Sequence, residues 1–151
     1  MCHLCGYQQG LPSLPVSCID AQFELCAYTL VQPRPPFIHQ LAVDAYAVQH
    51  LEEGRSPISI LFGLMGLFMV VEQGATGLEV QQAHQRKAKD PGRANWPKPT
   101  VQRHSFPMNV GHVLSAAPGP IRDHAIHRWV ESTWQALPEA HEVIRHFCLS
   151  R

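Results

Sequence analysis

The chain opens with MCHLCG, in which Cys2 and Cys5 stand three positions apart. This spacing is found both in thiol redox sites and in metal sites. A redox pair usually begins a helix that follows a strand, and only Met1 stands before Cys2. Redox chemistry is therefore not the interpretation that we favour. The two alternatives left open are a metal site and a chain end with no role of its own.

Two residues further along the chain could complete a metal site. Structural zinc takes four ligands at the corners of a tetrahedron, mostly cysteine sulfur and histidine nitrogen. Cys18 stands at the start of one predicted helix, and His39 stands in the first turns of the next. A loop that folds back over the start of both helices would bring these side chains together. We therefore predict a zinc ion, Zn2+, bound by Cys2, Cys5, Cys18 and His39.

The histidines allow a second site, because the chain has 10 of them. His39 and His50 share a helix face but lie ~16 Å apart along the helix axis, so they cannot hold one ion. Three histidines from separate helices would leave a metal with an open coordination position, as catalytic sites do. The alternative is that several histidines lie on helix faces by chance. The residues of this possible second pocket are Tyr46, Gln49, His50, His124 and His141.

Length and charge limit the classes to which the chain could belong. Its 151 residues are enough for one domain with a buried core. Lys and Arg together number 12, as do Asp and Glu, and this balance argues against a nucleic-acid-binding protein. The longest apolar run, 58–71, is shorter than the ~20 residues that span a bilayer. With no export signal and an odd number of cysteines, we expect a cytoplasmic protein with reduced thiols and no membrane contact.

The first two predicted helices would position the metal site. Residues 1–16 form an N-terminal loop that carries the first two cysteines, and Ser17 caps a helix over 17–30. A proline-rich break at 32–36 precedes a helix over about 36–50. The stripe expected to face the core of the first helix is Ile19, Phe23, Cys26, Ala27 and Leu30. The corresponding face of the second helix is Ile38, Leu41, Ala45 and Val48.

The rest of the chain also predicts helices. The third, from Pro57 to Gly74, is apolar nearly all round, so we place it at the centre of the fold. Thr76 begins a short polar helix, and residues 90–107 form a proline-rich internal loop. Further helical segments are expected at about 109–116 and 121–137, with a turn or kink continuing from Pro138. Little in the sequence indicates strands. We predict an all-α fold, one compact bundle of four to five helices over residues 1–151.

Several stretches together resemble an uncharacterised bacterial family, a domain of unknown function. They are CHLCG, SCIDAQFEL, HQLAVDAYAVQH and the closing HAIHRWVESTWQAL. The resemblance follows the pattern CxxCG, a third Cys, HxLxVxxYxxQH and a C-terminal RxWxxxxW helix. It departs at Gln40, where a second His is common, at Leu51, where Pro is usual, and over 75–107. It implies a structured, metal-binding helical domain and no particular activity.

Three functions are compatible with these features. The first is a small zinc-binding helical protein whose metal is mainly structural. The second is a metal-dependent hydrolase or transferase of the DinB-like helical-bundle type, which would use the histidine-rich pocket. The third is an interaction module with residues 90–107 as its contact. Phosphate-binding loops and the common hydrolase motifs are absent. Substrate, partners and oligomeric state are not predicted.

Overall fold

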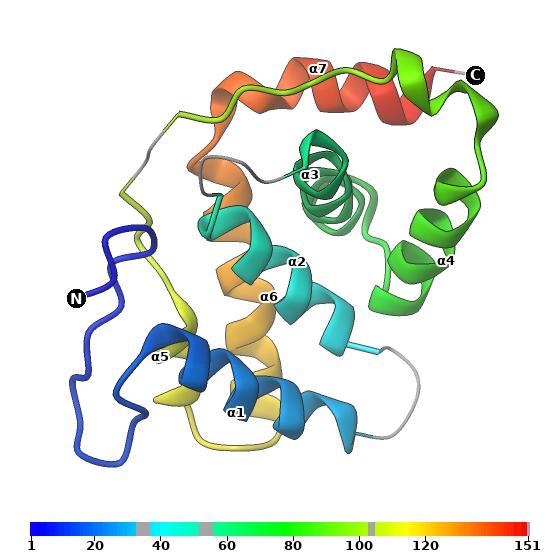
Figure 1. The fold of residues 1–151 in the computed structure, drawn as a ribbon. Helices are drawn as coiled ribbons and strands as arrows, with labels where there is room; N and C mark the ends of the chain where they lie inside the picture. Colours follow the sequence, from blue (N-terminus) through cyan, green and yellow to red (C-terminus); the bar gives the residue numbers. More distant parts are fainter. Residues whose placement is uncertain (33–36, 52–55, 103–104, 151) are drawn as a thin grey trace.

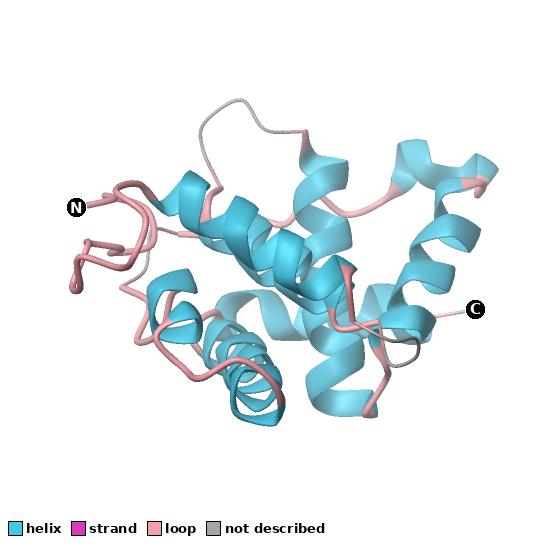
Figure 2. Cartoon of the chain, turned by 90° about the horizontal axis from the view of Figure 1, so that it is seen from below, coloured by secondary structure: helices cyan, strands magenta, loops and turns pink. Residues whose placement is uncertain are grey.

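The computed structural model describes residues 1–32, 37–51, 56–102 and 105–150. Within these ranges the chain is helical and contains no strand (Figures 1 and 2). The predicted all-α class is confirmed. The number of helices is larger than the expected four to five, because the second half of the chain forms several short, separate helices. In order they are α1 (Cys18–Leu30), α2 (His39–Gln49), α3 (Pro57–Gln73), α4 (Gly77–Ala88), a 3-10 helix η1 (Pro91–Asn95), α5 (Val110–Leu114), α6 (Pro120–Gln135) and α7 (Pro138–Leu149).

Helices α2, α3 and α6 pack against one another at the centre (Figure 1). The predicted central place of α3 is confirmed, since a continuous run from Gly63 to Phe68 is buried. Two glycines let α2 approach α3 closely. A Cβ atom added to Gly66 would lie 2.0 Å from Oδ2 of Asp44, and one added to Gly63 would lie 2.8 Å from Cγ2 of Val48. Within the described residues, no helix is both long and apolar enough to cross a membrane.

The two predicted core faces have opposite outcomes. On α2 the prediction is confirmed, because Ile38, Leu41, Ala45 and Val48 are all buried. On α1 it is wrong, because Phe23 is 64% exposed and Leu30 is 61% exposed. The buried face of α1 is instead made of Ala21, Gln22, Leu25 and Thr29.

A pattern of hydrophobic residues does not reveal the buried face of α1, because two of the residues on that face are polar. Nε2 of Gln22 donates a hydrogen bond to the carbonyl oxygen of Ala42, at 3.3 Å. Oγ1 of Thr29 donates to the carbonyl oxygen of Leu25, at 3.1 Å. The hydroxyl of Thr29 and the amide N–H group of Gln22 therefore have partners inside the fold, whereas Oε1 of Gln22 is buried without a partner among the described residues. The apolar stripe on the other side of α1 faces solvent.

Predicted helix starts agree well with the structure. The side-chain oxygen of Ser17 accepts a hydrogen bond from the backbone N–H of Asp20 and caps α1. Thr76 and Glu79 form a reciprocal capping box at the start of α4. Pro57 stands in the first turn of α3, and Gly74 ends that helix with a left-handed φ of 68°. The predicted start of the second helix at Pro36 and the break at 32–36 fall mostly outside the described residues.

The proline-rich stretch 90–107 is not a free-standing loop where it is described. It contains η1 and then runs along α7 (Figure 1). Trp96 lies edge-on to Phe62 of α3 and to Phe147 of α7, and the backbone N–H of Gln102 donates to the carboxylate of Glu139. This segment therefore covers one side of the core. Its predicted role as an interaction surface stays a prediction.

Candidate metal centre

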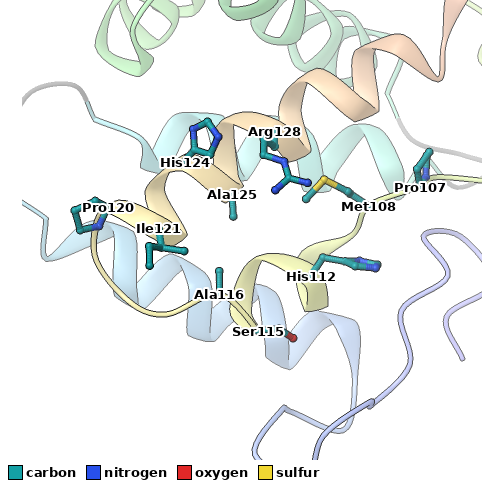
Figure 3. Close-up of a pocket in the computed structure, with 10 residues that line it drawn as sticks. All are labelled: Pro107, Met108, His112, Ser115, Ala116, Pro120, Ile121, His124, Ala125 and Arg128. Atoms are coloured by element: carbon teal, nitrogen blue, oxygen red, sulfur yellow. The ribbon is translucent and has the colours of Figure 1, made fainter.

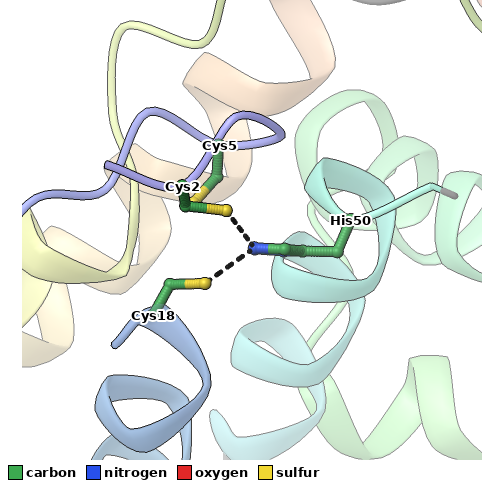
Figure 4. Close-up of side chains that lie close together, drawn as sticks. All are labelled: Cys2, Cys5, Cys18 and His50. Carbon is green, nitrogen blue, oxygen red and sulfur yellow. Dashed lines mark hydrogen bonds between the residues drawn. The ribbon is translucent and has the colours of Figure 1, made fainter. Parts of the chain in front are cut away.

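Three cysteines and one histidine converge beside the N-terminal loop (Figure 4). Cys2 and Cys5 belong to the loop, Cys18 is the first residue of α1, and His50 directly follows α2. Their four potential ligand atoms lie within 4.8 Å of one another. Nε2 of His50 is 3.7 Å from Sγ of Cys2 and 3.5 Å from Sγ of Cys18. Within the ranges given above, this is the one group of His, Cys, Asp and Glu side chains placed to hold a metal ion.

The loop forms a tight turn that presents both of its sulfur atoms. The backbone N–H of Cys2 donates to the carbonyl oxygen of Tyr7 at 2.7 Å, and that of Gly6 donates to the carbonyl oxygen of Cys2 at 2.9 Å. Gly6 has a φ of 75°, a conformation that glycine adopts without strain. The turn is anchored to the rest of the chain, because Nδ2 of Asn109 donates to the carbonyl oxygen of Cys5 at 3.3 Å.

His50 is oriented by its neighbour Tyr46. Nδ1 of His50 lies 2.7 Å from the carbonyl oxygen of Tyr46. A carbonyl can only accept, so Nδ1 carries the proton and Nε2 carries the lone pair. The two rings are stacked, with centroids 3.8 Å apart. The Tyr46 hydroxyl lies 3.7 Å from Sγ of Cys18, to which it donates. Metal-bound histidines are typically held in this way by a hydrogen bond from the nitrogen that faces away from the metal.

The three thiols differ in the ease with which they lose a proton. Burial raises the pKa of Cys5 to about 12, and it also raises the pKa of Cys18. Burial acts in the same direction on Cys2, but hydrogen bonds from the backbone N–H groups of Cys5 and Leu4 outweigh it and leave the pKa of Cys2 lowered. Without a cation, thiolates at these positions would repel one another at close range. A divalent cation among them would offset this repulsion between thiolates and displace the protons of the thiols.

The geometry fits tetrahedral zinc. Zinc–sulfur bonds of about 2.3 Å and zinc–nitrogen bonds of about 2.0–2.1 Å at tetrahedral angles put the sulfur and nitrogen ligands ~3.6 Å apart. The two sulfur–nitrogen distances at His50, 3.5 and 3.7 Å, agree with that value. Three thiolates and one imidazole also form a donor set that zinc prefers. The residues therefore fit the ion that the sequence predicts.

The structure differs from the sequence prediction at the fourth position, where His50 replaces His39. Nδ1 of His39 lies 2.8 Å from Oγ1 of Thr29, near the end of α1, far from the start of that helix. The reason is the direction of the chain. The start of α1 lies beside the end of α2, and the end of α1 lies beside the start of α2. The loop therefore meets the last turn of α2 and not its first.

The residues of the predicted second pocket are not brought together. Tyr46 and His50 belong to the cysteine cluster, and Nε2 of Gln49 donates to the carbonyl oxygen of Met108 and to Oγ1 of Thr133. His124 lines a cavity between α5 and α6. His141 stacks on Trp134, with ring centroids 4.1 Å apart, and hydrogen bonds the carbonyl oxygen of that residue. These positions give no support to a three-histidine catalytic metal site.

Tyr46 has a part in the site that its residue type alone did not reveal. In the sequence, Tyr46 is linked to His50 only because both lie on one helix face. A tyrosine one turn before a ligand histidine can stack on that ring, and its hydroxyl then reaches the neighbouring sulfur. Burial raises the pKa of Tyr46 well above its usual value, so the hydroxyl keeps its proton and remains a donor to Cys18.

Comparison with known proteins identifies a family to which the chain is similar. The model of a family of unknown function, DUF5946, matches residues 1–138. The matched range contains all four candidate ligands and Tyr46, and it ends at the first residue of α7. No curated protein and no solved structure matches the chain. The match agrees with the resemblance to an uncharacterised family, and it assigns no activity.

Proposed function

The chain belongs to the family of unknown function DUF5946, and we propose that it is a zinc protein in which Cys2, Cys5, Cys18 and His50 bind one Zn2+. The observation that carries this proposal is the convergence of their ligand atoms within 4.8 Å. The tautomer of His50 supports it, because the lone pair of Nε2 is directed toward the sulfur atoms. The metal would supply a fixed positive charge that holds the three thiolates together.

The role of the zinc in this proposal is structural. Four protein ligands fill the tetrahedral coordination of zinc, whereas catalytic zinc keeps a position open for water or substrate. The ligands come from three separate parts of the chain: the N-terminal loop, the start of α1 and the end of α2. An ion shared by these parts would fasten the loop across two helix ends. Its binding free energy would then add to the free energy of unfolding.

The proposal also favours a reducing compartment. None of the five cysteines forms a disulfide, and zinc thiolates require reduced sulfur. A cytoplasmic location follows as part of the proposal. The equal numbers of acidic and basic residues support our expectation that the protein does not act on nucleic acids.

The experiment that tests the proposal compares two histidine variants. Purified protein is expected to contain one zinc per chain and to keep it during gel filtration. His50→Ala should bind zinc at least about 100-fold more weakly in competition with a chromophoric chelator, since even loss of a residue that only supports a ligand costs about 10–100-fold. His39→Ala is the matched control and should retain full zinc content. Equal zinc affinity in both variants, or no zinc in the unmodified protein, would contradict the proposal.

A further inference from the structure

A cavity of about 780 Å³ lies between α5, α6 and the segment that precedes α5 (Figure 3). Its volume falls in the range of about 300–1,000 Å³ that is typical of small-molecule sites. Apolar side chains form much of its lining, namely Met108, Ala116, Ile121 and Ala125. Such a surface suits the apolar body of a ligand.

The polar side chains of the cavity carry no negative charge. Arg128 of α6 lines it, together with the imidazoles of His112 and His124, and no acidic side chain is among its lining residues. In the described parts of the chain, nothing forms a hydrogen bond or an ion pair with the Arg128 guanidinium. Arg122, one helical turn and a half earlier, is fully engaged by contrast. Its Nε donates to the carbonyl oxygen of Ala116 and its Nη2 to that of Leu114.

His112 adds a second polar side chain at the same cavity. Its Nδ1 lies 3.1 Å from the backbone nitrogen of Asn109 and 3.2 Å from Oδ1 of that residue. Nε2 is the ring nitrogen that Asn109 does not contact, and it is left to hydrogen bond a ligand. The cavity thus combines an arginine without a partner among the described residues, an imidazole nitrogen and an apolar wall.

We propose that this cavity binds a small carboxylic acid with an apolar body. The guanidinium of Arg128 would pair with the carboxylate, which it can do through two parallel hydrogen bonds. The apolar chain of the ligand would lie against Met108 and Ile121. One permanent cation suits a singly charged carboxylate better than a phosphate group, which carries more charge. This inference is independent of the metal centre, since none of the four zinc ligands lines the cavity.

The test uses octanoate as the probe and 1-octanol as its uncharged counterpart. Amide chemical shifts of the full chain are followed by NMR during each titration. Octanoate is expected to shift the signals of residues 112, 121, 125 and 128, and octanol should bind at least about tenfold more weakly. Arg128→Gln should weaken octanoate binding at least about tenfold, because it removes the one permanent cation among the lining residues.

Two further variants complete the design. Arg93→Gln removes an exposed arginine that does not line the cavity, and it should leave octanoate affinity unchanged. Ile121→Asp places a negative charge at the cavity on a residue that is 66% exposed, so the fold should survive while octanoate binding is lost. The proposal is overturned by equal affinity for octanoate and octanol, by shifts confined to the exposed face of α1, or by unchanged binding to Arg128→Gln.

Discussion

His50 hydrogen bonds the carbonyl oxygen of Tyr46 through Nδ1, across 2.7 Å, and this contact orients the imidazole as a metal ligand requires. The lone pair of Nε2 is left facing the sulfur atoms of Cys2 and Cys18. The stacked ring of Tyr46 keeps the imidazole in place. The last turn of α2 therefore orients one of the four candidate zinc ligands without help from the rest of the chain.

Tyr46 is expected to strengthen the site through its hydroxyl. Tyr46→Phe keeps the ring that stacks on His50 and removes the O–H that donates to Cys18. Zinc affinity should fall by about 10–100-fold, as is usual when a residue that supports a ligand is lost. Competition with a chelator measures this. Tyr28→Phe is the control, because the Tyr28 hydroxyl bonds Asp123 and Gly119 at another place. A decrease of the same size in both variants would show that the effect is not specific to the site.

Removal of zinc should free the N-terminal loop and leave the centre of the fold in place. With free zinc at a thousandfold excess over its Kd, binding stabilises the folded state by about 4 kcal/mol, so a chelator should lower the Tm. Hydrogen exchange should rise over residues 2–16, whereas the buried run Leu64–Phe68 of α3 should keep its protection. Unchanged exchange in the loop after zinc removal would mean that Tyr7 and Asn109 hold it without the metal.

Gly66 is expected to be intolerant of a side chain. A Cβ at this position would lie 2.0 Å from Oδ2 of buried Asp44, so Gly66→Ala should lower the free energy of unfolding by about 1–3 kcal/mol. Gly10→Ala, where nothing lies within 4 Å of the added atom, is the control. Adding Asp44→Ala to Gly66→Ala should recover part of the loss, because the clashing carboxylate is gone. Urea denaturation measures the free energies of unfolding. If the losses caused by Gly66→Ala and Asp44→Ala simply add in the double variant, the two sites are not in direct contact.

Asp44 should make stability decrease as pH rises. Burial raises the pKa of its carboxyl well above the usual value, so the folded protein holds a proton that the unfolded chain releases above about pH 4. Stability from this group is fully present below that pH and is lost as pH rises toward the raised pKa. Asp44→Asn should show a smaller decrease over the same range. Chemical denaturation at a series of pH values measures this, with the exposed Glu131→Gln as control.

His84, which lies 3.9 Å from Asp44, should act in the opposite direction at lower pH. Burial lowers the pKa of this imidazole, so below about pH 6.5 the unfolded chain binds a proton that the folded state does not. Stability from His84 is therefore lost as pH falls below that value.

For Asp44, the contradicting outcome is that the free energy of unfolding of the unmodified protein and that of Asp44→Asn depend on pH in the same way.

The orientation of α1 can be tested by a pair of substitutions. Phe23 is 64% exposed, so Phe23→Ser should change the free energy of unfolding by no more than about 0.5 kcal/mol. Leu25 is fully buried, and Leu25→Ala should lower the free energy of unfolding by about 2–5 kcal/mol. Urea denaturation of both variants is the measurement. A larger loss of stability in Phe23→Ser than in Leu25→Ala would contradict this orientation and would mean that the apolar stripe predicted from the sequence is the buried face.

Local patterns in the sequence predict much of the fold and three of the four candidate metal ligands. The apolar positions of α2 recur at helical spacing and are buried, and the caps at Ser17 and Thr76 follow from residue type. The residue type and the spacing of Cys2, Cys5 and Cys18 indicate that they are candidate zinc ligands. These features depend on neighbours along the chain, so a single sequence contains the information.

The fourth ligand and the face of α1 depend on how helices lie in space. His39 and His50 both belong to the second helical segment, and only its direction relative to α1 decides which of them meets the loop. Two helices joined by a short connection usually return antiparallel. That rule places the start of the first beside the end of the second, and it could have indicated His50. No such rule was available for α1, whose buried face carries hydrogen-bonded Gln22 and Thr29.

X-ray absorption at the zinc edge tests the central claim most directly, on the unmodified protein and on His50→Ala and His39→Ala. The account predicts one zinc per chain with three sulfur ligands at about 2.3 Å and one nitrogen ligand at about 2.0–2.1 Å. The nitrogen signal should disappear or be replaced by oxygen in His50→Ala and stay unchanged in His39→Ala. A metal surrounded mainly by nitrogen and oxygen, or a nitrogen signal that depends on His39, would contradict the account.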